Sequence, residues 1–203
     1  PTPEPTPTPT PKPTPTPTPT PTPSPTTLLV DNFESYPTAA PPPSPWLVAS
    51  GSWDVLSDQT KVAHTVTQGT LVTTVAGSAS WTDYKVTARV KAPISGFGKV
   101  VARYQDPNYM YVCGIENGTT LFLGKYYGGA WYNLNSSGFN YSATTWYYVS
   151  LTVLGDQLTC TATESGTGRT QTVTTTASYF TAGPAGFFGS PGAEFDDLNV
   201  TTV

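Results

Sequence analysis

Short stretches in which apolar and polar residues alternate occupy most of the chain from about residue 27 onward. In the segment 84–91, Tyr84, Val86, Ala88 and Val90 alternate with polar residues, which is the period of a half-buried β-strand. Segments 100–105, 109–115, 147–153, 186–188 and 195–200 are similar, and Gly, Pro, Asn or Asp lies between many of them. A helical period is nearly absent. We therefore predict an all-β, two-sheet antiparallel sandwich of jelly-roll type.

Two segments near the N-terminal end of this region need separate interpretation. Residues 28–33 have the composition of a strand, and we expect this strand to pair with the C-terminal one. The Pro-rich stretch 40–45 could be a second linker. Because a strand precedes it, we interpret it as a surface loop.

Residues 1–26 differ sharply from the rest, because every odd position from Pro1 to Pro25 is proline and most even positions are threonine. Such a segment has no apolar side chains from which to build a core, and proline favours polyproline II. At about 3.1 Å per residue it would reach roughly 80 Å. We predict a Pro-Thr-rich linker or stalk over 1–26 and one domain over 27–203. Because the sequence begins at Pro1 rather than methionine, we interpret it as a processed or excised piece.

Charged residues are scarce, and the formal net charge is −4. This balance argues against nucleic acid as a partner, because neutralising phosphates requires clustered Lys and Arg. No apolar stretch is long enough for a membrane span.

Cys113 and Cys160 are the only cysteines, and their spacing fits no zinc or redox motif. One interpretation is a disulfide, which would close a long loop and contribute about 4 kcal/mol. The other is two small core side chains in strands. The sequence leaves both open.

Catalytic residues are not indicated. Retaining glycosidases need two carboxylates about 5 Å apart, and the jelly-roll glucanases supply them as Glu-x-Asp-x-x-Glu, a spacing that this sequence lacks. The one dense acidic cluster, 194–197, lies on the terminal strand, where we expect an edge or packing position. His64 is the only histidine, and we interpret it as structural. We predict that the domain is not an enzyme.

Aromatic residues mixed with polar ones suggest a sugar-binding surface, because sugar rings stack on Trp and Tyr while their hydroxyls need polar partners. Arg89, Arg103 and Lys125 fall on successive predicted strands and could form a basic stripe suited to an acidic polysaccharide. The alternative is that most of the tyrosines pack in the core or at its rim. The candidate binding residues are Arg89, Arg103, Gln105, Asn108, Tyr109, Tyr111, Lys125, Tyr126, Tyr127, Trp131 and Tyr132.

The order of several short motifs resembles the laminin-G-like, concanavalin-type jelly-roll modules attached to bacterial polysaccharide lyases and glycoside hydrolases. The resemblance covers essentially all of residues 28–203. It implies carbohydrate binding outside the cell, and it implies core positions for Trp53, Trp81 and Trp146. The motifs are Val30-Asp31-Asn32-Phe33-Glu34, Gly51-Ser52-Trp53-Asp54-Val55, Ser80-Trp81-Thr82-Asp83-Tyr84-Lys85-Val86, Ala88-Arg89-Val90-Lys91, Ala102-Arg103-Tyr104-Gln105-Asp106, Asn108-Tyr109, Leu123-Gly124-Lys125, Trp146-Tyr147 and Glu194-Phe195-Asp196-Asp197-Leu198.

The same resemblance suggests a structural Ca²⁺ that joins the first and last strands. Asp31 and Glu34 at one end and Asp196 and Asp197 at the other offer the oxygen ligands that Ca²⁺ prefers. The alternative is an acidic, solvated strand edge.

We therefore expect a non-catalytic, secreted or cell-surface carbohydrate-binding module that anchors a larger protein to polysaccharide. The alternative is a structural subunit of an extracellular filament, adhesin or surface layer. In that case the Pro-Thr arm, which could carry O-glycans, would mediate self-association.

Overall fold

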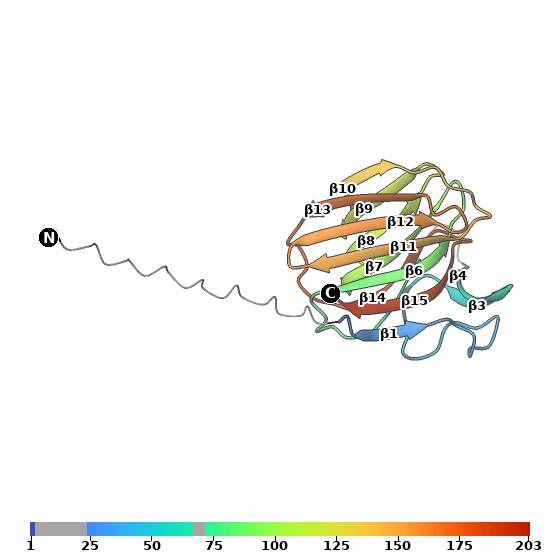
Figure 1. Cartoon of the computed structure of the whole chain (residues 1–203). Helices are drawn as coiled ribbons and strands as arrows, with labels where there is room; N and C mark the ends of the chain where they lie inside the picture. The colour runs from blue at the N-terminus through green and yellow to red at the C-terminus, as the bar shows by residue number, and fades with distance from the viewer. Residues whose placement is uncertain (3–23, 67–71) are drawn as a thin grey trace.

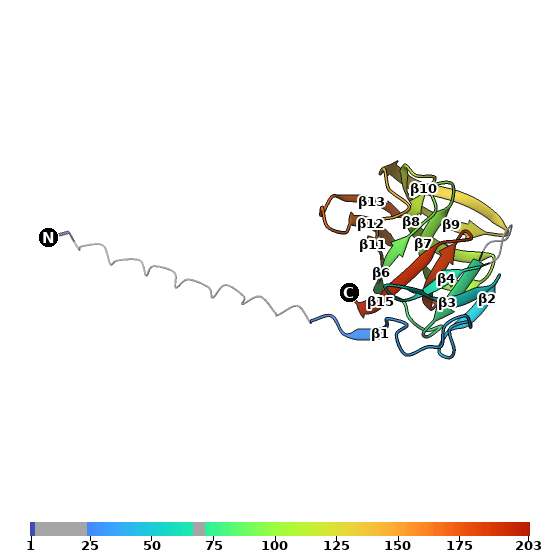
Figure 2. The same cartoon turned by 90° about the vertical axis from the view of Figure 1, so that its right-hand side faces the viewer.

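A computed structural model shows a sandwich of two antiparallel β-sheets, drawn from two directions in Figures 1 and 2. It describes residues 1–2, 24–66 and 72–203. The predicted stalk therefore lies largely outside the described residues. Within those ranges every regular element is a β-strand, and no helix could cross a membrane.

Sheet A contains eight strands and lies nearer the viewer in Figure 1. Its order is β13-β12-β11-β6-β15-β4-β3, and β1 pairs with β15 beside β4. The bounds are β1 Thr27–Asp31, β3 Trp53–Asp58, β4 Thr60–Thr65, β6 Tyr84–Lys91, β11 Tyr147–Leu154, β12 Gln157–Glu164, β13 Thr170–Thr176 and β15 Glu194–Thr202.

Sheet B contains seven strands in the order β10-β9-β8-β7-β14-β5-β2. Its bounds are β2 Leu47–Ser50, β5 Val72–Ala76, β7 Phe97–Asp106, β8 Tyr109–Glu116, β9 Thr120–Tyr127, β10 Ala130–Gly138 and β14 Ala185–Gly189. The all-β sandwich predicted from alternation is confirmed.

The terminal strand is central rather than marginal. β15 lies between β6 on one side and β4 and β1 on the other. Of the two positions expected for the acidic cluster, edge or packing, the edge position is therefore wrong. The pairing of β1 with the C-terminal strand is confirmed. The stretch 40–45 is a loop, as predicted.

The main core lies between the sheets, where the apolar positions of both layers meet. Val86 of β6 and Leu151 of β11 are neighbours in sheet A, and Leu123 of β9 lies in sheet B. All three are fully buried. Each such side chain contributes roughly 2 kcal/mol through removal of apolar area from water.

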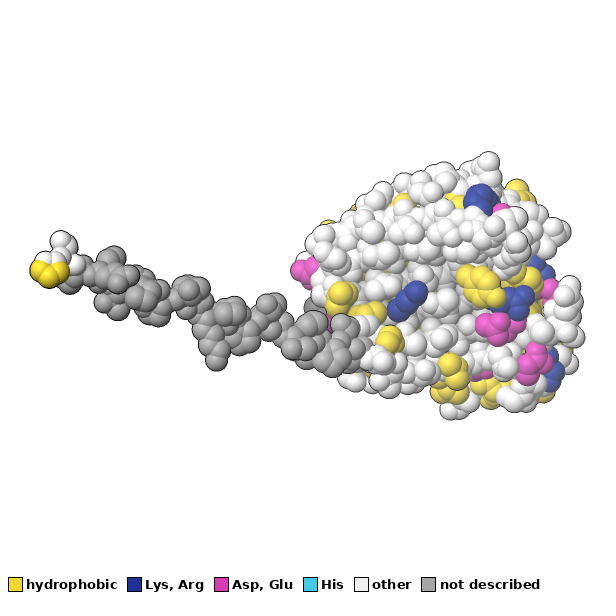
Figure 3. Space-filling view, viewed as in Figure 1, with side chains coloured by type: hydrophobic (Ala, Val, Ile, Leu, Met, Phe, Trp, Pro, Cys, Tyr) yellow, Lys and Arg dark blue, Asp and Glu magenta, His cyan; other side chains and the backbone are white. Residues whose placement is uncertain are grey.

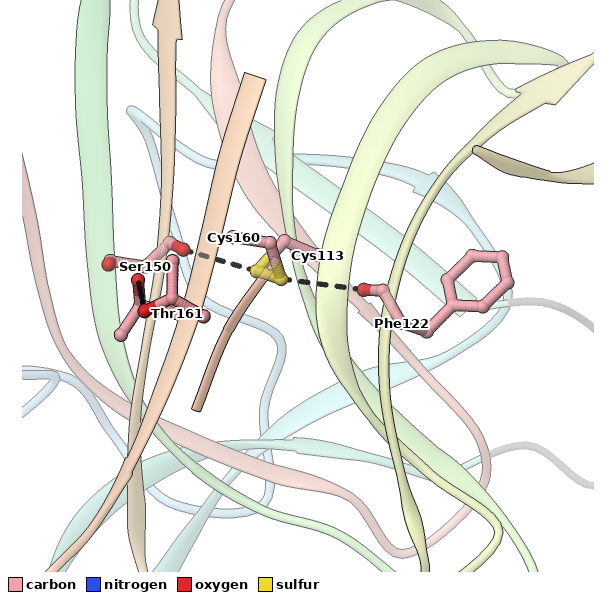
Figure 4. Close-up of a disulfide and its surroundings, with 6 residues drawn as sticks. Cys113, Phe122, Ser150, Cys160 and Thr161 are labelled. Carbon is pink, nitrogen blue, oxygen red and sulfur yellow. Dashed lines mark hydrogen bonds between the residues drawn. A yellow bond between two sulfur atoms is a disulfide. The ribbon is translucent and has the colours of Figure 1, made fainter. Parts of the chain in front are cut away.

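A disulfide joins the two layers within this core. Cys113 of β8 in sheet B is bonded to Cys160 of β12 in sheet A, with Cα atoms 5.5 Å apart. The carbonyl oxygens of Ser150 and Phe122 lie 3.1 and 3.5 Å from the two sulfurs (Figure 4). The structure thus resolves the alternative that the sequence left open.

The outer face of sheet A is mainly uncharged and polar, which is why it is largely white in Figure 3. Threonines of β12 and β13 face each other across the strands, and Thr161–Thr172 and Thr163–Thr170 are hydrogen-bonded at 3.0 and 2.9 Å. Tyr148 is an exposed tyrosine on β11.

Candidate functional site

The alternation of β9 and β10 divides the predicted aromatic residues between the two faces of sheet B. Trp131 is directly opposite Tyr126, and Tyr132 is opposite Lys125. Because successive side chains of a strand point to opposite faces, the first pair lies on the outer face and the second on the face toward sheet A. The aromatic residues of β9 and β10, predicted from the sequence to form one surface, therefore contribute to two.

Three exposed tyrosines surround Lys125 at the β9–β10 edge. The Nζ atom of Lys125 lies 4.7, 4.9 and 2.8 Å from the ring centroids of Tyr127, Tyr132 and Tyr179. These rings are 43%, 46% and 53% exposed, whereas Lys125 is 5% exposed. We call these four residues the tyrosine cluster.

Tyr179 was not predicted, because it belongs to no strand and follows β13 of the other sheet. The Tyr111 hydroxyl accepts hydrogen bonds from the backbone amides of Tyr179 and Phe180, at 2.7 and 3.2 Å. The loop is therefore attached to sheet B. A tyrosine in an irregular Pro- and Gly-containing stretch was the available signal.

Polar groups lie beside the cluster. Tyr109 is half-buried and packs edge-on against Tyr127 with ring centroids 5.1 Å apart. Asn108 is exposed and, with the Tyr109 hydroxyl, lies beside the Gly128–Gly129 turn. Both glycines have positive φ, at 60° and 81°, a conformation that other residues adopt with strain.

The outer face of sheet B carries a second aromatic group, the tryptophan platform. Trp131 is 38% exposed and packs on Tyr126 and Phe188, with ring centroids 4.6 and 4.9 Å away. Beneath it, Lys99 lies 4.9 Å from the Trp131 ring centroid and forms a 2.5 Å ion pair with Glu116. Tyr126 is only 8% exposed, so it supports the platform from below.

We expect Lys99 to make the stability of the domain depend on pH in the alkaline range. Burial lowers the pKa of Lys99 to about 8, against the opposing effect of Glu116, whereas an unfolded lysine titrates near 10.4. Between pH 8 and 10 the unfolded chain binds more protons, so the free energy of unfolding should rise with pH by roughly 2 kcal/mol. Above pH 10 the trend should reverse, because burial raises the pKa of Tyr104 to about 12.

Urea unfolding of the wild type and of Lys99→Met from pH 7.5 to 10 checks this expectation. The difference in the free energy of unfolding between the two proteins should change by that amount over the range. Parallel pH profiles would contradict it.

Two predicted binding residues are buried instead. Arg103 is 2% exposed, and its guanidinium lies 3.1 Å from Asp83. Tyr111 is fully buried and donates to Ala177 O at 3.0 Å. Neither side chain can line an open surface. Gln105 is exposed, and its amide donates to Ala182 O in the loop after β13.

The predicted basic stripe does not form. Arg89 lies on sheet A, where it is 3.4 Å from both Asp196 and Asp197 and 4.7 Å from the centre of the Trp146 ring. Arg103 is in the interior of the domain, and Lys125 is on sheet B. The three lie on β6, β7 and β9, and β6 belongs to the opposite layer.

The three tryptophans expected in the core differ in how deeply they are buried. Trp53 is 3% exposed and belongs to the main core. Trp81 is partly buried against that core, and Trp146 lies at the surface beside the Arg89 and Lys91 cations.

The four carboxylates predicted to bind Ca²⁺ already have protein partners. Asp31 accepts hydrogen bonds from Phe33 N, the Tyr36 hydroxyl and Trp46 Nε1, at 2.8, 2.5 and 2.7 Å. Asp31 and Asp197 line one open groove, which is formed by β1, the segment that follows it and β15.

The other two carboxylates are also engaged. Glu34 accepts from Lys61 N at 2.9 Å. Asp196 is 2% exposed, and burial raises its pKa. In the described ranges no group of three or more His, Cys, Asp or Glu side chains is placed to hold a metal. A structural Ca²⁺ therefore stays a prediction.

Other ionisable groups on β3, β4, β6 and the start of β15 lie in short contacts with one another. His64 Nδ1 lies 2.9 Å from Asp54 Oδ1. Lys91 contacts Asp58 and lies 2.8 Å from Glu194. Within the described residues, no hydroxyl or thiol is hydrogen-bonded to His64. The arrangement is that of a surface ion-pair network.

The two layers form a β-sandwich with a lectin-like fold. No protein-family model matches the sequence, and no curated protein matches it. Among solved structures, the chain is similar to the carbohydrate-binding module CBM66 from Bacillus subtilis, with a TM-score of 0.59 and 17% identity over 77% of this chain and 91% of that one. The lectin UEA-II complexed with galactose gives a TM-score of 0.61 and 10% identity over 88% of this chain and 100% of the lectin.

Enzymes also appear among the similar structures. Xylan β-1,4-xylosidase from Bacillus halodurans C-125 gives a TM-score of 0.59 and 13% identity. The match covers 84% of this chain but only 38% of the xylosidase. At such identities the comparisons establish the shared fold.

Proposed function

We propose that the domain binds carbohydrate without catalysis and that the tyrosine cluster is the surface that contacts the sugar. The observation that carries this proposal is the convergence of three half-exposed tyrosine rings on one cation at the β9–β10 edge. The fold shared with a carbohydrate-binding module and a lectin supports it.

The chemistry of the cluster suits a sugar. Aromatic faces accept the apolar C–H face of a pyranose ring, and half-exposed tyrosines lose little side-chain freedom on binding. The tyrosine hydroxyls and Asn108 offer hydrogen-bond partners to sugar hydroxyls. Together these groups make a small amphipathic surface rather than a deep pocket.

The setting we propose is outside the cell. The disulfide between the layers is a bond that persists in oxidising compartments. The Pro-Thr segment would then act as a spacer that keeps the domain and a partner domain at high effective concentration near polysaccharide.

The first test compares variants of matched chemistry. Replacing Tyr127, Tyr132 and Tyr179 together by alanine should weaken binding to the best ligand of a glycan array at least 100-fold, because truncating several central aromatic contacts removes about 3 kcal/mol or more. Tyr148→Ala removes an equally exposed tyrosine from sheet A and should leave affinity unchanged. Isothermal titration calorimetry measures both.

Other outcomes would lead to different conclusions. If the triple variant binds like the wild type and Trp131→Ala does not, the sugar surface is the tryptophan platform. If the wild type binds no glycan, the proposed function is wrong. Release of new reducing ends or unsaturated uronate from a bound polymer would contradict the absence of catalysis.

A further inference from the structure

Lys125 differs from the other buried cations of the domain. Lys99, Arg103 and Lys125 are 2%, 2% and 5% exposed. Lys99 pairs with Glu116, and Arg103 pairs with Asp83. In the part of the chain that the structure describes, Lys125 has no carboxylate partner and no hydrogen bond.

A buried charge without a counter-ion is unfavourable, which is why such groups are usually paired. The rings of Tyr127, Tyr132 and Tyr179 compensate in part, since a desolvated cation–π contact is worth roughly 2 kcal/mol. They supply no negative charge. The electrostatic requirement of Lys125 is therefore only partly met within the described chain.

The ammonium group is covered by movable side chains rather than sealed in the core. The described side-chain nitrogen and oxygen atoms that are sealed from solvent and have no hydrogen-bond partner are Trp53 Nε1, Ser165 Oγ and Glu194 Oε2, the last of which lies in the ion pair with Lys91. Lys125 Nζ is not one of them, so it retains contact with solvent. The three rings around it are each about half exposed, and a rotation of one ring would open the cation to a ligand.

We propose that Lys125 binds the acid group of an anionic glycan, so that the tyrosine cluster selects charged sugars over neutral ones. The inference rests on the proposed function and names its ligand class. A carboxylate or sulfate ester that reaches Nζ would supply the missing counter-ion while the sugar ring stacks on tyrosine. An ion pair in this desolvated position is stronger than one on the open surface.

This assignment differs from the basic stripe expected from the sequence. Arg89 and Arg103 are held by carboxylates of the protein, and only Lys125 is left for a ligand. Selectivity would then come from one point charge within an aromatic surface. Lysine binds both carboxylates and sulfates as a point charge, so both acid groups have to be tested.

The experiment uses the whole chain and two pairs of polymers. Polygalacturonate is compared with its carboxyl-reduced, neutral product, and dextran sulfate is compared with dextran. We expect the wild type to bind at least one acidic polymer 10-fold or more tightly than its neutral partner. Preference in the first pair alone identifies a carboxylate ligand, and preference in the second pair alone identifies a sulfate ligand.

Lys125→Met retains the apolar stem and removes the charge, so it should lower the ratio of acidic to neutral affinity to about one. Lys125→Arg should keep the preference. Lys85→Met is the control, because Lys85 is an exposed lysine on the outer face of sheet A. Melting curves establish that each variant is folded.

The results separate the two proposals. Equal binding of acidic and neutral polymers, lost in the triple tyrosine variant, overturns the role of Lys125 and leaves the proposed function intact. Equal weakening of acidic and neutral binding by Lys125→Met also overturns it, because Lys125 would then only support the rings. A wild type that binds none of the four polymers, although it binds a neutral glycan on the array, overturns the inference alone.

Discussion

Replacing Arg103 by methionine should lower the free energy of unfolding by about 3–5 kcal/mol, because it removes a buried guanidinium and leaves several polar groups around it without their donor. The guanidinium donates to Thr82 O, Gly155 O and Phe180 O at 2.8, 2.9 and 3.0 Å. It also lies 3.1 Å from Asp83. Methionine would leave three carbonyls and a carboxylate without this donor.

The position of Arg103 explains why the effect should be large. The three carbonyls belong to the segment before β6, the turn after β11 and the loop after β13. One side chain thus holds together three connections that are distant in sequence. The last of these loops carries Tyr179, so the variant should also disturb the tyrosine cluster.

Chemical denaturation of Arg103→Met and Arg169→Met measures the effect against a matched control. Arg169 is 43% exposed and pairs with Glu164 at the surface, so its loss should change stability by less than about 1 kcal/mol. The melting temperature of the Arg103→Met variant should be lower than that of the wild type by roughly 10 °C. Equal stability of the two variants would show that the buried network contributes little.

The fold could be predicted because each layer has one face in the core. In β6 the residues Tyr84, Val86, Ala88 and Val90 are all buried, and that alternation appears directly in the sequence. Turn residues in the sequence also indicated where strands end, because they adopt backbone conformations that strands do not. Asn117 and Gly118 at the predicted hairpin turn both have positive φ.

The candidate site was harder to predict, because it depends on which strands are neighbours. Alternation could place Arg103 on a polar face, but a register shift between Ala102 and Asp106 interrupts the β7–β8 ladder. Arg103 itself has φ +48°, and its side chain points inward. Local periodicity gives no sign of such a bulge.

The close approach of the loop after β13 to strand β7 also depends on a glycine. Gly183 has φ +144°, and a Cβ atom there would lie 2.3 Å from Tyr104 O. Only glycine allows the loop to pass so near β7. The sequence shows the glycine but not the strand that it faces, so the contribution of Tyr179 from that loop could not be anticipated.

Reducing the Cys113–Cys160 disulfide should lower the free energy of unfolding by about 4 kcal/mol, because the bond closes a loop of 47 residues in the unfolded chain. Wild type in dithiothreitol and the double variant Cys113→Ala, Cys160→Ala should unfold at the same urea concentration. The oxidised wild type should unfold at a higher one. A thiol titration confirms that the reduced sample is reduced, and coincident curves for oxidised and reduced protein would contradict the expectation.

The same bond should also matter for binding, because the tyrosine cluster is built from both layers. Tyr127 and Tyr132 belong to sheet B, whereas Tyr179 lies in the loop after β13, which is an edge strand of sheet A. The disulfide joins β8, the neighbour of β9, to β12, the neighbour of β13. We therefore expect glycan affinity to fall several-fold on reduction under conditions in which the domain stays folded. Unchanged affinity would mean that Tyr111, through its hydrogen bonds to the loop, holds Tyr179 in place without help from the disulfide.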